Sequence, residues 1–535
     1  MTPKRAELLL VFALFAVLLA PCPASATIRY RVSLAHPEQH LFHVTMTIPH
    51  GAAGAVVAIP SWNALYMVRD FGYRVRDVQA WIVDAAGHEK GRDAVVALDK
   101  QTWRIGQPSA QAVGSITRRP NADDLEVRYV IQWNDPGPFD TQLNPHHAFV
   151  NLAEILMYLP RARNEDTSVS FTDLPAGWQT ATQLNAVRVD NEYAAPSYDA
   201  LVDAPVEAGK FEEFEFDSGG AHFRVVVDAA DWSKRQLGDA LSRITSYELG
   251  LMGGPPFDTP RKQYTFFFHI GPYGEVGGGG MEHANSTAIA ATSIDSAVAI
   301  AAHEFFHVWN VKRIRPQALE PVDYTKEQYT RALWFAEGVT STYGAFALER
   351  TGLWSKSEFY TDLGTQISRL QSRPAHAWQS VEESSLDAWF EKYDDYNEPD
   401  RSISYYNKGQ IVGVLLDLAI RDATDNRKSL DDVMRRMNDE YPRLGKFYDE
   451  SAGIRAVVEE VAGKSFDDFF RRYVSGVDEI PYDDFLGMAG LELKTETVAG
   501  GPGAPSTMRA SISEIPHASE RQRRIREGFL RGSTD

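Results

Sequence analysis

Cysteine is almost absent from this chain of 535 residues, and its single occurrence, Cys22, lies in an N-terminal segment that we expect to be removed. A mature chain without cysteine cannot form disulfides or use thiol chemistry. Long apolar runs are also missing after that segment, so the sequence offers no candidate for a membrane-spanning helix there. Basic residues are in the minority: 54 Lys and Arg against 73 Asp and Glu give a net charge of −19. This acidic balance disfavours nucleic acid as a partner.

The N-terminus has the pattern of a secretory signal peptide. Lys4 and Arg5 precede an apolar run over 8–20, and Ala24-Ser25-Ala26 follows as an A-x-A cleavage site. The run is too short to span a bilayer comfortably. We therefore expect residues 1–26 to be a signal peptide cut near Ala26. The mature protein would then be exported, periplasmic or secreted, without stable membrane insertion; a retained anchor is the alternative.

The pattern of apolar residues predicts an α+β protein of several domains. Over 27–202, runs such as 42–48 and 125–133 alternate between apolar and polar residues, which is typical of half-buried antiparallel strands. This predicts an N-terminal antiparallel β domain. Further on, the continuous apolar run 263–271 suits a buried strand of a small sheet, and helical patterns dominate after Asp295.

The remaining segments complete the expected organisation. We expect a catalytic domain over 203–425 and a mostly helical C-terminal part of the catalytic region over 426–497. Residues 498–535 are rich in Gly, Pro and Ser and then become basic, as at Arg523 and Arg524. That composition predicts a disordered tail.

The most informative motif is H-E-F-F-H at 303–307, in a stretch that is expected to stay helical until Pro316. Residues four apart share one face of a helix, so His303 and His307 can hold one Zn²⁺ together. Glu304 follows the first of these histidines directly and can act as a general base toward water. The alternative is a solvated helix that carries two histidines by chance.

A catalytic zinc needs a third protein ligand. The next helical stretch is expected over 326–348, and Glu337 lies in its middle among Leu333, Trp334 and Val339. A carboxylate surrounded by apolar residues is costly unless it is paired or bound to a metal. Glu337 is therefore the candidate third ligand for one Zn²⁺ per chain. It could instead face solvent or pair with an arginine.

Two further segments carry residue types that suit a peptide-binding cleft. The glycine-rich run 277–280 leads into Met281, Glu282 and His283. Glycine lets the backbone approach a ligand closely, and a carboxylate facing a cleft is a suitable counter-ion for an ammonium group. The alternative is a mobile loop that ends in a surface glutamate. Downstream, Tyr406 opens another helical pattern; its phenol can stabilise developing negative charge, or it can be a packed aromatic.

H-E-x-x-H followed by E-G in a second helical stretch resembles the gluzincin metallopeptidases. The longer strings HEFFHVWNVKRIRP and LWFAEGVTSTY look like the glycyl aminopeptidase family within that group. The resemblance implies a thermolysin-like catalytic domain with zinc on His303, His307 and Glu337, and with Glu304 as the general base. Many members continue into a PDZ domain, which the 38 residues of 498–535 are too few to form.

The same resemblance assigns roles in substrate binding. The segment 279–283 is similar to the G-x-M-E-N element of these enzymes, with His in place of Asn, which implies that Gly280, Met281 and Glu282 bind substrate. Glu282 would hold the free α-ammonium group. The segment 406–409 resembles their Y-x-K-G element, which implies that the hydroxyl of Tyr406 donates to the oxyanion.

Together these residues predict a zinc-dependent aminopeptidase that acts on peptides with a free N-terminus. The family resemblance suggests Gly or Ala as the residue removed. A zinc endopeptidase with the same site and a non-catalytic peptide-binding protein remain alternatives. The sequence leaves open the oligomeric state, and zinc is inferred from the ligand types alone.

Overall fold

The structure, a computed structural model, describes most of the chain. The described residues are 27–51, 54–63, 66–106, 123–187, 191–257, 259, 262–272, 275–390, 398–498 and 507–533. The predicted signal peptide over 1–26 lies outside them. Within the described part of the chain, no helix is both long enough and apolar enough to cross a membrane.

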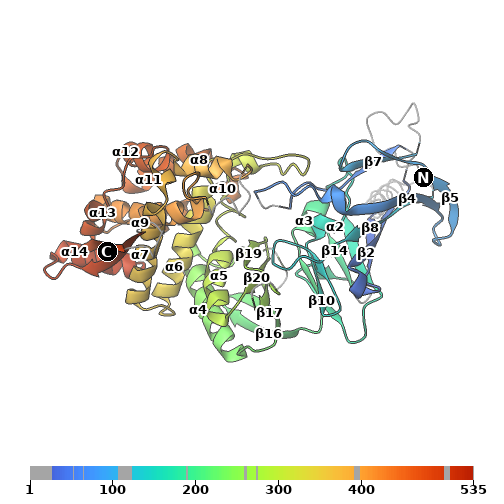
Figure 1. Ribbon diagram of the computed structural model, residues 1–535, viewed down its shortest axis with the longest axis horizontal. Coiled ribbons are helices and arrows are strands. Elements are labelled where there is room, and N and C mark those ends of the chain that lie inside the picture. The colour runs from blue at the N-terminus through green and yellow to red at the C-terminus, as the bar shows by residue number, and fades with distance from the viewer. Residues whose placement is uncertain are drawn as a thin grey trace, which may run out of the picture.

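The N-terminal part is built of sheets, as the alternating pattern predicts, and lies on the right of Figure 1. Its largest sheet is mainly antiparallel, with one parallel pair between β1 and β11. In order, that sheet contains β13 (Asn185–Ala186), β14 (Glu192–Ala195), β11 (Thr167–Thr172), β1 (Ile28–Ser33), β2 (Leu41–Ile48), β8 (Asp124–Gln132), β4 (Val75–Val83) and β5 (Glu89–Asp93).

Two smaller sheets and two short helices complete this part. One sheet has the order β3 (Ala55–Ala58), β7 (Thr102–Ile105) and β6 (Val95–Ala97). The other has the order β12 (Gln179–Ala181), β15 (Val206–Gly209), β10 (His147–Val150) and β9 (Gln142–Leu143). The helices are α2 (Leu152–Ile155) and α3 (Tyr198–Val202). Because β15 pairs with β10, the chain stays with these N-terminal sheets beyond the expected limit at residue 202, and that limit remains a prediction.

A five-stranded mixed sheet carries the first part of the catalytic region. Its order is β16 (Glu212–Ser218), β17 (Ala221–Ala229), β18 (Gln263–Ile270), β20 (Ser286–Ala291) and β19 (Gly279–Glu282). The apolar run at 263–270 is the central strand β18, and it is buried along almost its whole length. One face of β18 packs on helices, while its Phe267 packs against Phe149 of β10. The N-terminal sheets and the catalytic sheet are therefore joined by an apolar layer.

Helices form the remainder, on the left of Figure 1. Helices α4 (Lys234–Met252) and α5 (Ile294–Phe306) pack on each other, and α5 also lies against the sheet. The helices that follow are α6 (Thr340–Arg350), α7 (Lys356–Gln371), α8 (Val381–Asp387), α9 (Tyr405–Thr424), α10 (Leu430–Leu444), α11 (Glu450–Ala462), α12 (Asp467–Phe469) and α13 (Tyr482–Met488).

The prediction of a disordered tail over 498–535 is wrong for the described part of that range. Strand β21 (Leu491–Val498) pairs with β22 (Thr507–Glu514), and α14 (Glu520–Arg531) follows. Ile525 and Phe529 lie one helical turn apart and are fully buried, with Phe529 packed against Phe346 and Phe359. Of the arginines in this basic run, Arg521 pairs with Asp422 and Arg524 with Asp425, whereas Arg523 donates to the carbonyl of Ala518. The segment forms an amphipathic helix that its basic composition did not indicate.

Candidate active site

Helix α5 places the two motif histidines face to face. The helix begins after Ser293, whose hydroxyl accepts a hydrogen bond from the Ser296 amide. Its regular turns end at Phe306, so the expected extension to Pro316 is wrong. His307 nevertheless keeps helical dihedral angles, with φ −59° and ψ −19°. The Nε2 atoms of His303 and His307 therefore lie only 3.0 Å apart.

Glu337 completes this convergence. Its Oε2 lies 3.4 Å from Nε2 of His303 and 3.2 Å from Nε2 of His307. Glu337 sits in a π-helical turn, Trp334–Val339, that leads directly into α6. The helix expected from residue 326 thus begins only at the π-turn. Within it, Gly338 packs against Gly409 of α9 so closely that a β-carbon on either residue would overlap the other backbone.

Hydrogen bonds on the far side of each imidazole orient the two rings. Nδ1 of His307 donates to the carbonyl of Asn310 at 2.7 Å. Nδ1 of His303 lies 3.2 Å from the hydroxyl of Ser341, which itself donates to the carbonyl of Glu337. With Nδ1 of each ring engaged in this way, Nε2 of each ring faces the Glu337 carboxylate. This is the arrangement that ligating histidines adopt in metal sites.

The charge state of the cluster favours a cation. Burial would raise the pKa of Glu337, but the adjacent histidines outweigh that effect and hold it well below its usual range. Burial opposes protonation of His307, yet the Glu337 carboxylate raises its pKa to about 10. Burial lowers the pKa of His303. Two imidazole nitrogens and one carboxylate oxygen are the donors that zinc prefers, so the residues fit this metal.

Glu304 is directed into the same cavity, which has a volume of about 550 Å³. The residue is buried, and its Oε2 has no hydrogen-bond partner among the described residues. Burial raises the pKa of this carboxyl well above its ordinary value. Its carboxylate packs against Gly280 of β19, where only a hydrogen atom fits. A carboxyl with one unsatisfied oxygen, close to the ring nitrogens of His303 and His307, is suited to exchange a proton with water.

The remaining predicted residues reach this cavity to different degrees. Gly280, Glu282 and Tyr406 line it, and the ring of Tyr406 lies 6.2 Å from that of His303. Tyr405 is stacked on Tyr406 but is buried and is not among the residues that line the cavity. The side chain of Met281 is also buried and is not part of the lining. Met281 can contribute to the site only through its backbone.

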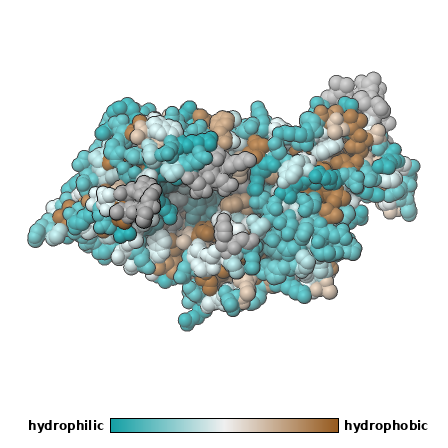
Figure 2. All heavy atoms as spheres, in the orientation of Figure 1, coloured by the Kyte–Doolittle hydropathy of each residue, from teal (hydrophilic) through white to brown (hydrophobic). Residues whose placement is uncertain are grey.

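The structure also adds wall residues that local sequence patterns did not reveal. Tyr66 and Phe139 of the N-terminal part line the catalytic cavity. The ring of Phe139 lies against Gly279, and Gly277 packs on the backbone of Gly137. These glycines therefore allow close contact with the N-terminal part. Figure 2 shows the surface hollowed in the middle of the view, near the region where Figure 1 shows β19 and α6.

His283, which replaces the Asn of the motif, is held by a charged network behind Glu282. Its Nδ1 lies 3.5 Å from Oδ1 of Asp203, and Nζ of Lys312 lies 3.2 Å from the same oxygen. The second oxygen of Asp203 accepts from the amide of Ala284 at 2.8 Å. Asp203 thus fixes the chain immediately after β19. No signal along the sequence linked residues 203, 283 and 312.

A second cluster of metal-ligand types lies at the interface of two sheets. His147 of β10, Glu207 of β15 and His269 of β18 are all buried. The two oxygens of Glu207 are used separately, with one 3.0 Å from Nδ1 of His147 and the other 2.9 Å from Nε2 of His269. Because hydrogen bonds account for both contacts, this cluster is a polar clamp between the N-terminal and catalytic sheets.

Comparisons with known proteins agree with this geometry. Two family models match: the M61 glycyl aminopeptidase over residues 296–412 and the Peptidase M61 N-terminal domain over residues 29–210. Together they span more than half of the chain. The first match contains His303, Glu304, His307, Glu337 and Tyr406, whereas Glu282 lies outside both. A comparison with the curated proteins finds no match.

Two solved structures are similar to this chain to different degrees. That of an aminopeptidase N family protein from Idiomarina loihiensis is 24% identical, covers 88% of this chain and 80% of that chain, and has a TM-score of 0.79. That of an M1 zinc metallopeptidase from Deinococcus radiodurans is 15% identical, covers 85% of this chain and 95% of that chain, and has a TM-score of 0.49. The first of these likenesses establishes a common architecture.

Proposed function

The chain belongs to the M61 glycyl aminopeptidase family and is a peptidase, and from this premise we propose that it is a zinc-dependent aminopeptidase removing N-terminal Gly or Ala from peptides. One observation carries the proposal. The Nε2 atoms of His303 and His307 and Oε2 of Glu337 converge within 3.0–3.4 Å of one another. The carboxyl of Glu304, whose Oε2 has no hydrogen-bond partner among the described residues, lies in the same cavity.

His303, His307 and Glu337 would hold the zinc ion. When bound, zinc supplies Lewis-acid chemistry, which acidifies water and polarises a carbonyl. Glu304 accepts the proton of the attacking water and later passes it to the leaving amine, a role that the raised pKa of this buried carboxyl suits. The hydroxyl of Tyr406 donates a hydrogen bond to the oxyanion.

Substrate orientation rests on β19. This strand is at the edge of its sheet, and no described strand pairs with the backbone edge that does not face β20, so an extended peptide could pair there. Glu282, the last residue of β19, lines the cavity and can pair with the α-ammonium group of the substrate. Such an anchor restricts cleavage to the first peptide bond.

The first test is hydrolysis of alanyl- and glycyl-anilides beside their N-acetylated forms, by mature protein supplied with zinc. Turnover of the free amines alone is expected. Equal turnover of the blocked forms would support an endopeptidase instead. A zinc-loaded protein that hydrolyses neither set would favour the peptide-binding alternative.

A matched pair of variants tests the chemistry. Glu304→Gln is expected to lower kcat by roughly 10²–10⁴-fold with bound zinc retained, because the general base is lost. Glu349→Gln makes the same substitution on the nearby helix α6 but outside the cavity, and should retain activity. Equal activities of the two variants would remove Glu304 from the mechanism.

We also propose that the protein is exported, which is supported by the basic, apolar and A-x-A order of residues 1–26. N-terminal sequencing of protein recovered from the extracytoplasmic fraction should begin at Thr27. A chain that retains its first residues there would point to an uncleaved anchor.

A further inference from the structure

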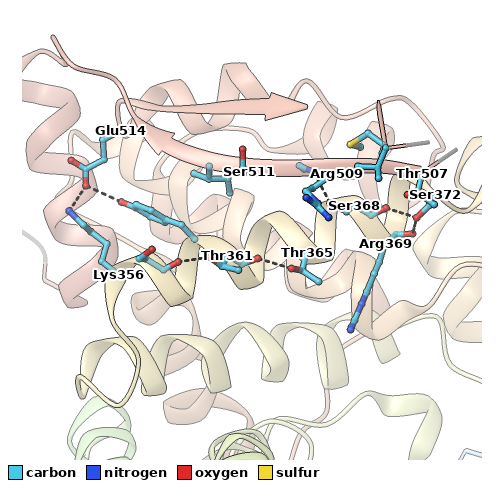
Figure 3. A pocket seen from close by; sticks show the side chains of 16 residues that line it. Lys356, Thr361, Thr365, Ser368, Arg369, Ser372, Thr507, Arg509, Ser511 and Glu514 are labelled. Carbon is cyan, nitrogen blue, oxygen red and sulfur yellow. Dashed lines mark hydrogen bonds and ion pairs between the residues drawn. The ribbon is translucent and has the colours of Figure 1, made fainter. Parts of the chain in front are cut away.

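Arg369 is the one Lys or Arg among the described residues that line the catalytic cavity. Acidic side chains dominate the charge of that lining, namely those of Glu282, Glu304, Glu337 and Asp362. Arg369 comes from the last turn of α7, and Figure 3 shows its side chain extending away from β22. A single cation in an acidic cavity is a specific place for an anionic group of a ligand.

The guanidinium of Arg369 has no hydrogen bond or ion pair with any described residue. The nearby carboxylate of Asp362 is already occupied, since Gln366 and Gln410 donate to its two oxygens at 3.1 Å and 2.8 Å. Arg373, one turn further on, is different because its Nε donates to the carbonyl of Ser402 at 2.7 Å. Arg369 is thus a charged donor that the described part of the chain leaves without a partner.

The packing order separates Arg369 from Glu282. Strand β19 packs on α5, α5 on α6, and α6 on α7, so Glu282 and Arg369 come from elements at opposite ends of this series. A second hollow of about 520 Å³ adjoins the catalytic cavity and shares Gln366, Arg369, Tyr406 and Gln410 with it. A peptide anchored at Glu282 can therefore extend past Tyr406 toward Arg369.

We infer that Arg369 binds the C-terminal carboxylate of the substrate, which makes short peptides with two free ends the preferred substrate class. A short peptide carries an ammonium group at one end and a carboxylate at the other. Glu282 and Arg369 match this pair of charges, and arginine is well suited to a carboxylate because its donors form a planar fork. The inference rests on the proposed aminopeptidase function and adds the recognition of the second terminus.

The test compares hydrolysis of Ala-Ala-Ala with that of its C-terminal amide. The free acid is expected to have a KM lower by about fivefold, the effect of one solvent-accessible ion pair. Arg369→Gln should bring the acid-to-amide ratio of KM values close to one, and Arg369→Lys should restore part of the preference. Lys356→Gln removes a positive charge from the other end of α7, outside the catalytic cavity, and should keep the full preference.

The possible results separate this inference from the proposed function. If wild-type protein hydrolyses alanyl-anilide and both tripeptides but shows no preference for the acid, Arg369 has no such role. The same holds if Arg369→Gln keeps the preference. If alanyl-anilide and both tripeptides all resist hydrolysis by the zinc-loaded protein, the aminopeptidase function itself is wrong.

Discussion

Replacing Gly280 with alanine should displace Glu304 while leaving the metal ligands in place. A methyl group at position 280 would lie 2.5 Å from Cγ of Glu304 and closer still to its carboxylate. Gly280 does not have a positive φ, so alanine fits the backbone. Strand β19 is held by its pairing with β20, and therefore the Glu304 side chain is the part that must move.

The size of this effect follows from the overlap. Relieving it requires the carboxylate to shift by about 1 Å, a displacement that can lower a catalysed rate by roughly 100-fold. We therefore expect kcat of Gly280→Ala to fall by roughly 100-fold, which corresponds to about 2.7 kcal/mol in the activation barrier. Zinc content should be unchanged, because His303, His307 and Glu337 lie outside the overlap.

The assay is steady-state hydrolysis of alanyl-anilide, with zinc measured by elemental analysis of the same samples. Gly250→Ala is the control, since a methyl group at that position in α4 meets no heavy atom within 4 Å. This control should keep wild-type kcat. Wild-type kcat in Gly280→Ala would refute the idea that Glu304, in the position seen here, is the base. Loss of zinc from Gly280→Ala would refute the idea that this substitution displaces Glu304 without disturbing the proposed metal ligands.

Three further changes test other parts of the structure. Burial would raise the pKa of Glu207, but His147 lowers it to about 2, and Glu207 in turn raises the pKa of His147. A carboxyl whose pKa is lowered on folding stabilises the fold at pH values above its unfolded pKa, and a histidine whose pKa is raised stabilises the fold below its unfolded pKa. Glu207→Gln should therefore lower the free energy of unfolding by about 3 kcal/mol, with the largest loss between about pH 4.5 and 6.5. Urea denaturation across pH measures this, and a difference independent of pH would contradict the clamp. Asp203→Ala should raise the KM for alanyl-anilide more than it lowers kcat, because the segment behind Glu282 loosens; an unchanged KM would argue against that support. Phe529→Ala should lower the free energy of unfolding by about 3–5 kcal/mol, whereas a change below about 1 kcal/mol would indicate that α14 does not pack on the catalytic region.

Local spacing was sufficient to predict which side chains converge as the proposed metal ligands. His303 and His307 face each other because any helical turn brings residues four apart to one side, and this held although α5 ends at Phe306. Glu337 stood out since a carboxylate in an apolar segment needs a partner. The buried strand at 263–270 followed equally from its unbroken apolar run.

The composition of the C-terminal segment led to the wrong prediction of a disordered tail, because its local pattern is ambiguous. Residues 520–531 are rich in arginine, and the same sequence fits a solvated tail or a helix with one apolar stripe. Whether this segment folds as a helix depends on an apolar surface against which its apolar side chains can pack. Phe346 and Phe359, from distant parts of the chain, provide that surface for Phe529. The π-helical turn around Glu337 was similarly invisible, because it depends on the close approach of Gly338 and Gly409.

The sequence by itself therefore predicted the proposed ligands and determined the strand-rich N-terminal part and the helical C-terminal part, because each depends on a pattern within one segment. Only the tertiary structure decided the walls of the cavity, the support of His283 by Asp203, and the position of Arg369 in the cavity lining. Those features depend on side chains that are far apart in the sequence and meet only when sheets and helices pack. A pattern within one segment does not indicate which distant residues will contact that segment in the folded protein.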